Sequence, residues 1–120
     1  MSYLLLIMED PERRRSLSAE EGSAALARMV RFADGLERRG VLRARDSLTS
    51  DARGVRIRVR GGKRTVMDGP FTEAKEIVGG FFLLDGITKA EAVAIASECP
   101  ATEWATVEVR EIGNCWEGNE

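Results

Sequence analysis

Histidine is absent from this 120-residue chain, and cysteine, proline and tyrosine are scarce. Without histidine no Ser-His-Asp or Cys-His triad can form, no imidazole can bind a metal, and no side chain has an unperturbed pKa near neutrality. A catalyst here would depend on shifted carboxylates, lysine, tyrosine or cysteine. The two cysteines, Cys99 and Cys115, lack the close spacing of a zinc knuckle or a redox CxxC pair. The sequence therefore predicts no metal site and no cofactor.

Long apolar runs and an excess of one charge are also missing. The apolar run over residues 3–8 is too short to cross a bilayer, and Glu9 and Asp10 follow where a signal peptide would stay apolar. The chain has 18 basic and 20 acidic residues, a net charge of −2, so no global field gathers nucleic acid or an anionic membrane. We expect a cytoplasmic protein with neither of these partners.

The composition fits one globular domain, because 43% of the residues are hydrophobic in a chain of modest length. We expect a single domain over residues 1–112 and a C-terminal tail over residues 113–120. Cys99 and Trp104 are expected to pack in or against the core. Trp116 lies in the otherwise polar tail, and we predict that it docks on the domain or on a partner.

Two capping boxes mark the starts of helices. Residues 18–21 and residues 88–91 both place a hydroxyl three positions before a glutamate, so each side chain can bond a free backbone amide of the other residue. Gly40 suits the left-handed position that ends the first helix, and Pro100 stops the second. The side chains expected to face the core are Leu26, Met29, Val30, Ala33 and Leu36, then Ala92, Val93 and Ala96.

Short apolar segments predict strands, and glycines separate some of them. The expected strands are residues 2–8, 41–44, 55–60, 65–67, 81–84 and 104–112. Valine and isoleucine alternate with arginine over residues 55–60, which indicates a strand with one apolar face, and Gly61-Gly62 then makes a hairpin turn. Residues 46–54 are predicted to form a loop. Gly79-Gly80 is expected to end a short helical turn.

This order of elements predicts an α+β sandwich of ferredoxin-like type with an inserted β-hairpin. In such a fold the helices cover one face of the sheet. Residues 3–8 and 81–84 are apolar on both faces, so the open face needs a cover. A second copy of the chain is the simplest cover, and we therefore expect a homodimer joined through the open sheet face.

Residues 68–76, Asp-Gly-Pro-Phe-Thr-Glu-Ala-Lys-Glu, concentrate most of the chemistry of this chain. Pro70 fixes its own φ and restricts the residue before it, so Asp68 is held on a defined turn. Thr72 can cap a short helical turn, whose positive end suits an acidic side chain such as Glu73. Such a turn can bind and polarise a small ligand.

We predict that a small polar metabolite binds in a cleft beside this turn. Asp68 is the candidate catalytic acid or base, or orients one, while Lys75 meets an anionic group and Glu76 adjusts Lys75. Phe71 forms an apolar wall. The candidate ligand-binding residues are Phe71, Glu73, Lys75, Glu76, Tyr3 and Met8. On turn chemistry alone, a purely structural role is favoured: Asp68 closes its turn, Phe71 fills the core, and the later charges are solvated.

The motif at residues 68–76 resembles the signature of the YCII-related family, whose DGPF subgroup is named after its first four letters. The N-terminal strand, the two-glycine step into Phe81 and residues 107–110 extend the resemblance over nearly the whole chain. It implies a dimeric α+β barrel. Better-studied relatives are thought to use a His-Asp pair, which this chain cannot form. Genes of this subgroup often accompany sigma-factor-like regulators, so a non-catalytic protein-binding or regulatory module stays open as the alternative function.

The chain also has two arginine-rich segments. Arg56, Arg58, Arg60 and their neighbours surround the glycine hairpin, where they could contact phosphates or, as we favour, keep a charged edge from aggregating. Residues 13–15 are three arginines that we place in a solvated loop before the first helix.

Overall fold

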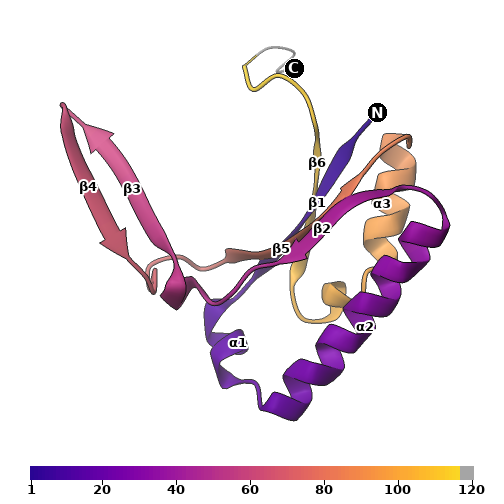
Figure 1. Ribbon diagram of the computed structural model, residues 1–120, viewed down its shortest axis with the longest axis horizontal. Helices are drawn as coiled ribbons and strands as arrows, with labels where there is room; N and C mark the ends of the chain where they lie inside the picture. The colour runs from indigo at the N-terminus through magenta and orange to yellow at the C-terminus, as the bar shows by residue number, and fades with distance from the viewer. Residues whose placement is uncertain (117–120) are drawn as a thin grey trace.

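The computed structural model describes residues 1–116, which form an antiparallel four-stranded sheet with helices on one face and a separate two-stranded hairpin (Figure 1). The strands lie in the order β2-β5-β1-β6, and their bounds are β1 Tyr3–Glu9, β2 Leu42–Ser47, β5 Ile77–Leu84 and β6 Thr106–Glu111. The helices α2 Ala19–Arg38 and α3 Lys89–Glu98 connect β1 to β2 and β5 to β6. This mixed α+β arrangement is compatible with the expected ferredoxin-like fold.

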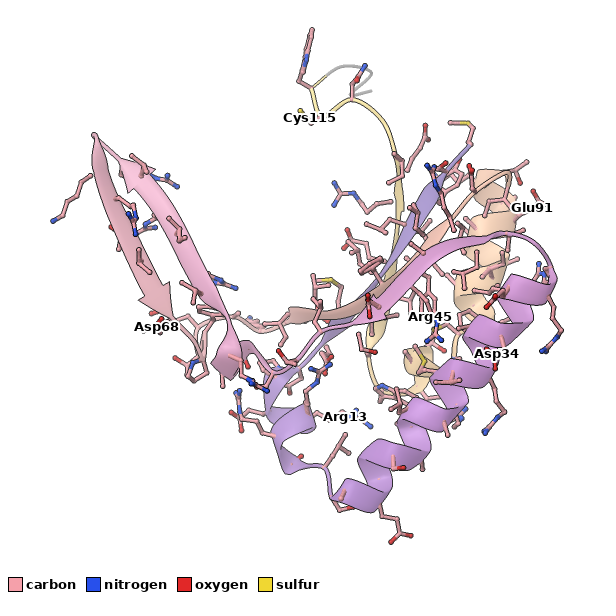
Figure 2. All side chains as sticks on the ribbon, viewed as in Figure 1. Arg13, Asp34, Arg45, Asp68, Glu91 and Cys115 are labelled. Atoms are coloured by element: carbon pink, nitrogen blue, oxygen red, sulfur yellow. The ribbon has the colours of Figure 1, made fainter. Side chains whose placement is uncertain are left out.

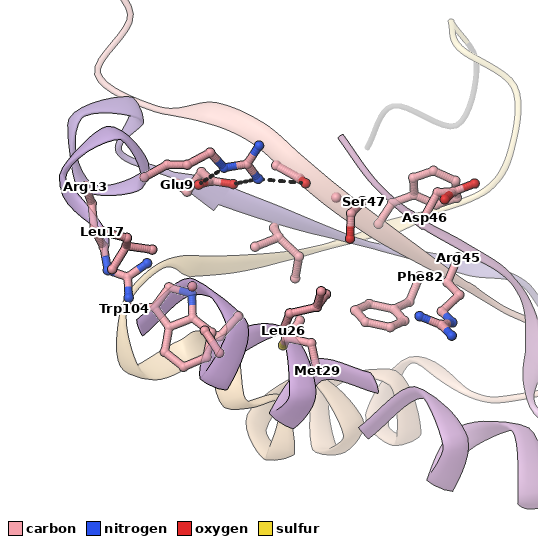
Figure 3. A pocket seen from close by; sticks show the side chains of 18 of the residues that line it. Glu9, Arg13, Leu17, Leu26, Met29, Arg45, Asp46, Ser47, Phe82 and Trp104 are labelled. Atoms are coloured by element: carbon pink, nitrogen blue, oxygen red, sulfur yellow. Dashed lines mark hydrogen bonds and ion pairs between the residues drawn. The ribbon is translucent and has the colours of Figure 1, made fainter. Parts of the chain in front are cut away.

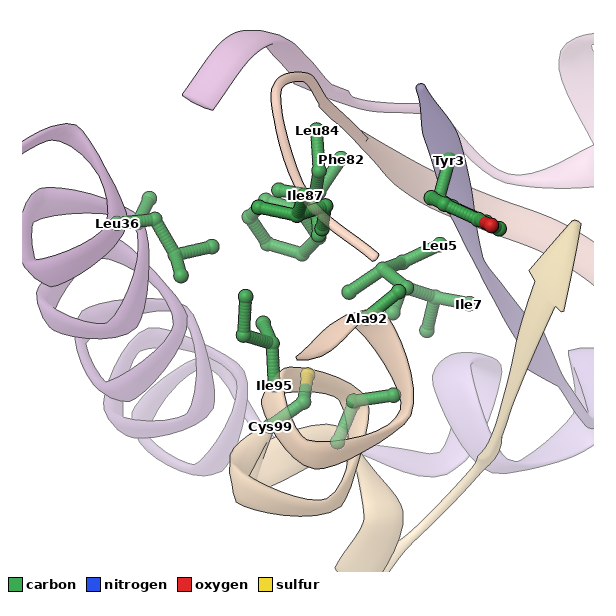
Figure 4. Packing of buried hydrophobic residues seen from close by; sticks show 13 residues of the cluster. Tyr3, Leu5, Ile7, Leu36, Phe82, Leu84, Ile87, Ala92, Ile95 and Cys99 are labelled. Atoms are coloured by element: carbon green, nitrogen blue, oxygen red, sulfur yellow. The ribbon is translucent and has the colours of Figure 1, made fainter. Parts of the chain in front are cut away.

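The core lies between the sheet and the two helices (Figure 4). Successive strand residues point to opposite faces, so Tyr3, Leu5 and Ile7 are buried while the residues between them are only half-buried. Phe82 on β5 meets Phe32 on α2 edge to face, with ring centroids 5.3 Å apart. Cys99 is 1% exposed beneath the end of α3, as predicted for a core residue.

Both capping boxes are confirmed, with the hydroxyl and the glutamate of each box bonded to the opposite backbone amide. Gly40 adopts φ 73° just after α2, as its position predicted. Two of the side chains expected to face the core are not buried in it: Leu26 is 54% exposed and Val93 is 47% exposed. Figure 1 shows why for Leu26: the first turns of α2 diverge from the sheet. On α3, Ile95 takes the buried position instead of Val93.

The arginine-rich segment before α2 forms a short helix, α1 Pro11–Ser16, and not the predicted loop. The Asp10 carboxylate accepts a hydrogen bond from the backbone N–H of Glu12, and Pro11 occupies the first turn, where its missing N–H leaves no donor unpaired. Both signals were present in the sequence.

The segment after the motif also differs from prediction, because it holds one β-turn and no helical turn. The N–H of Ala74 donates to the carbonyl of Phe71 at 3.0 Å, and β5 then begins at Ile77. Gly79 and Gly80 therefore lie inside a strand. A side chain at Gly79 would collide with the Glu9 carboxylate, since an added Cβ would lie 1.5 Å from its Oε1. The glycines permit close packing here and end no helix.

The remaining differences concern loop lengths. β2 runs on to Ser47, and a 3₁₀ turn, η1 Asp51–Arg53, occupies the segment predicted as an irregular loop. Trp104 precedes the last strand, because a second 3₁₀ turn, η2 Pro100–Glu103, follows α3.

Within residues 1–116, no helix combines the length and apolarity that crossing a membrane requires.

A two-stranded hairpin projects from the sheet (Figure 1). It consists of β3 Val55–Arg60 and β4 Lys63–Asp68, which pair only with each other among the described strands. Gly61 and Gly62 both have positive φ at its tip, as a tight hairpin turn requires.

Candidate functional site

A buried carboxylate, Asp51 of η1, anchors the motif loop. Its Oδ2 accepts a hydrogen bond from the N–H of Phe71 at 3.0 Å, and its Oδ1 accepts one from the Arg15 guanidinium at 2.8 Å. The N–H of Phe71, opposed by desolvation and assisted by Arg15, lowers the pKa of Asp51 below its usual value. Asp51 itself is only 8% exposed.

The motif backbone is packed as closely as this anchor suggests. Gly69 donates its N–H to the carbonyl of Gly54 at 2.9 Å. A Cβ at Gly69 would lie 1.9 Å from the carbonyl oxygen of Asp51, so only glycine fits. The turn is thus fixed against η1 at the foot of the hairpin.

The motif's charged side chains point into water. Asp68, Glu73, Lys75 and Glu76 are all exposed, and Figure 2 shows Asp68 at the foot of the hairpin, well apart from Arg45. Phe71 is half-buried, with the Arg56 guanidinium 4.0 Å from its ring centroid, and it is not part of the main core.

The seven predicted site residues do not converge on one place. Phe71 and Glu73 line a hollow of about 490 Å³ against the basic strand, whereas Asp68, Lys75 and Glu76 are not among its lining residues. Tyr3 is 3% exposed within the core, and Met8 is half-buried. Because residues an odd number apart face opposite sides of β1, Tyr3 and Met8 do not share a site.

Helix α1 supplies a second buried ion pair. The Arg14 guanidinium donates to both oxygens of Glu9, at 3.0 Å from Nε and 2.6 Å from Nη2, and also to the carbonyls of Leu48 and Gly79. Glu9 is 7% exposed. The prediction of three solvated arginines was therefore wrong, because helix formation directs Arg14 and Arg15 onto buried carboxylates.

A cavity of about 340 Å³ opens beside this ion pair, between the sheet and the N-terminal half of α2 (Figure 3). Small residues of α2, Gly22 and Ala25, leave the space open on the helix side, and Gly79-Gly80 lines it from β5, where the glycines let Glu9 and β2 pack closely. Its larger apolar walls come from Ile7, Leu17, Leu26, Met29, Phe82 and Trp104. The divergence of α2 thus leaves a pocket of a size that small ligands occupy.

Positive charge borders this cavity. Arg13 and Arg45 line it, and within residues 1–116 neither has a carboxylate within ion-pair distance, although the capping-box hydrogen bonds and, from farther away, Arg13 lower the pKa of Glu21. The Arg13 guanidinium lies 5.2 Å from the Trp104 ring centroid, within cation–π range. The acidic lining residues are Glu9, already paired with Arg14, and Asp46 at the exposed edge of β2. The arrangement suits an anionic group attached to an apolar body.

Sequence reasoning missed this cavity, although parts of its signal were visible. Glycines at 79 and 80 inside an apolar segment can mark a strand that another group approaches closely. The position of Arg45 opposite α2 depends on strand pairing, which the sequence pattern does not give. Within residues 1–116, no cluster of three or more His, Cys, Asp or Glu side chains is arranged to hold a metal ion.

Comparison with known proteins places the chain in a family. No curated protein matches the sequence. A family model described as the YCII-related domain matches residues 1–115, which is nearly the whole chain and includes every strand and helix of the structure. The chain therefore belongs to the YCII-related domain family.

Proposed function

We propose that this protein is a homodimeric small-molecule-binding protein of the DGPF subgroup, and that its ligand binds in the cavity between the sheet and α2. One observation carries the proposal: an apolar cavity of about 340 Å³ is bordered by two guanidiniums, Arg13 and Arg45, that have no ion-pair partner within residues 1–116. Apolar pockets with a few polar groups in fixed places are the usual form of ligand sites. Arg13 and Arg45 lie at opposite ends of this cavity (Figure 3), so each offers its own place for an anionic group.

The lining defines the chemical class of the ligand. The walls formed by Phe82, Met29 and Trp104 favour a short aliphatic chain or a single ring. Arg13 and Arg45 favour a carboxylate or phosphate on that body, because a guanidinium pairs strongly with planar or tetrahedral oxyanions. The proposed ligand is a small amphipathic anion.

In this proposal the motif at residues 68–76 holds α1 in place and does not itself bind the ligand. Through Asp51 and Arg15, the turn at residues 68–76 fixes α1, and α1 carries Arg13 and Arg14 to the cavity. Asp68 is exposed, so no desolvated environment prepares it for general acid–base catalysis. The activity proposed here is accordingly binding. The hollow beside Phe71, with Arg56 and Arg58 on its wall, is a second place for a small anion.

The dimer rests on the open face of the sheet. Leu4, Leu6 and Met8 alternate with the core residues of β1 and face away from the helices. The register places Leu4 opposite Leu83 and Leu6 opposite Phe81, so apolar residues of β1 and β5 form one patch. Packing two such faces about a two-fold axis removes both from water.

The rival function is a non-catalytic protein-binding or regulatory module associated with sigma-factor-type transcription regulation. The exposed apolar hairpin favours some protein contact. A ligand in the cavity distinguishes the two functions, since the regulatory module needs none.

Fluorescence of Trp104, which lines the cavity, tests the proposal. In a Trp116→Phe background that leaves one tryptophan, octanoate, octanol and octylammonium are titrated separately. We expect octanoate to change the Trp104 emission at the lowest concentration. Arg45→Met should weaken octanoate binding by at least about tenfold, the value of one charge-assisted hydrogen bond. Arg43→Met is the matched control, because Arg43 lies on the same strand outside the cavity lining.

A second variant locates the site. Gly22→Leu should fill the cavity and abolish octanoate binding, and the new side chain has room, because an added Cβ meets no atom within 4 Å. Octanoate binding that survives Gly22→Leu would exclude the cavity. Equal binding of octanol and octanoate would refute the anionic ligand, and a Phe71→Ala variant that alone loses binding would move the site to the hollow beside the motif.

A further inference from the structure

The hairpin exposes an apolar face that the rest of the described chain does not cover. Each residue of β3 and β4 is exposed, and Val55, Ile57, Val59 and Val66 are between 47% and 64% exposed. Ile57 pairs with Val66 across the ladder, and directly paired residues share a face, so these four side chains form one surface. A free two-stranded hairpin is at best marginally stable in water. We therefore expect its apolar face to pack against a partner.

The hairpin is nevertheless held in a defined direction at its base. The N–H of Gly69 bonds to the carbonyl of Gly54, Asp51 accepts from Phe71, and Arg56 covers the Phe71 ring. Figure 1 shows the hairpin standing out from the end of the sheet, on the side away from α2 and α3. The open face of the sheet looks toward the same side.

The overall size reflects this projection. The radius of gyration is 16.2 Å, whereas a compact domain of this length has about 13.6 Å. The four-stranded sheet and its helices form the compact part, and the projecting hairpin contributes to the excess. It extends like an arm beyond the body that carries it.

The arm and the rest of the chain also carry opposite net charges. Residues 55–68 hold five basic residues and one acidic residue, a net charge of +4, which leaves −6 on the rest of the chain. A second copy of the chain thus offers the arm an oppositely charged body, and joining the open sheet faces brings the arm beside that body. Nucleic acid would match the charge but not the valine and isoleucine face.

We propose that the β3–β4 hairpin is a dimerisation arm, whose apolar face packs on the body of the second copy beside the joined sheet faces. This inference rests on the proposed homodimer. Two-fold symmetry makes the contact reciprocal, so each arm covers the partner and every contact occurs twice. The arm completes the interface and carries the motif loop at its foot to the boundary between the copies.

Replacing one apolar residue of the arm tests the proposal. Ile57 is 64% exposed, so Ile57→Glu removes little packing within one copy. We expect sedimentation equilibrium to show a dimer dissociation constant raised by at least about tenfold, because each arm loses a buried side chain. Val93→Glu is the matched control: Val93 is 47% exposed on α3, on the helix side of the sheet, and its substitution should leave the constant unchanged.

A photo-crosslinking residue at position 57 shows which part of the second copy the arm contacts. In a mixture of ¹⁵N-labelled and unlabelled chains, we expect mixed-label crosslinks between the arm and residues 1–9 or 77–84. A wild-type dimer that Ile57→Glu leaves unchanged would overturn the arm while the sheet-face dimer stands. A wild type that stays monomeric would overturn both. Crosslinks that join the arm only to its own chain would also refute the proposal.

Discussion

Asp51 links two separate segments of the chain, and neither the motif nor any simple spacing rule singled it out. Its carboxylate connects the motif loop, through the Phe71 N–H, to α1, through Arg15. Both contacts stabilise the ionised carboxylate, so its folded-state pKa lies below the unfolded value. Its contribution to stability is fully present above the unfolded pKa, 3.8, and is lost as the pH falls through the folded pKa.

Substitution of Asp51 gives the first prediction. Asp51→Asn should lower the melting temperature by several degrees at pH 7, because the charge-assisted bond to Arg15 is lost. The difference from wild type should shrink as the pH falls below about 4, where wild-type Asp51 becomes protonated as well. Thermal melts followed by circular dichroism between pH 7 and pH 3 measure this. A difference that stays constant over the whole range would contradict the assigned role of the carboxylate.

Two glycines give a second prediction with opposite signs. Gly79→Ala should destabilise the protein by about 1–3 kcal/mol, because its Cβ displaces the Glu9 carboxylate from its pair with Arg14. Gly22→Ala should stabilise it by about 0.5–1 kcal/mol, since Gly22 lies inside α2 with open space around it. Urea unfolding provides both free energies. Equal changes in the free energy of unfolding for the two substitutions would show that the close packing at Gly79 does not contribute to stability.

At the scale of elements, features that depend on local sequence signals were predicted correctly, whereas features that depend on long-range contacts were not. The capping boxes that open α2 and α3 need only four residues each, and both were predicted correctly. The short helix α1 was missed although Asp10 and Pro11 are a start signal, because three consecutive arginines suggested a solvated loop. The cavity was not predicted, since it depends on the divergence of α2 from the sheet and on the strand pairing that brings Arg45 to it.

The same divergence predicts uneven stability along α2. Ala33 and Leu36, in the C-terminal half, are the buried residues of this helix, whereas the N-terminal half borders the cavity. Few buried contacts lower the free energy of local opening. Amide hydrogen exchange should therefore be faster over residues 22–28 than over residues 31–38, and octanoate should slow the first segment selectively. Uniform exchange along the helix would mean that its N-terminal half packs as firmly as the rest.

For the whole molecule, the proposed dimer joins two incomplete surfaces, the open sheet face and the arm. Because association stabilises the folded state by mass action, the melting temperature should rise with protein concentration. Leu6→Glu, on the open face, should abolish that rise, whereas Gly22→Leu, which fills the cavity, should preserve it. Differential scanning calorimetry over a hundredfold concentration range separates the cases. A melting temperature independent of concentration in the wild type would leave the two apolar faces for another protein, and the regulatory module would then be the better function.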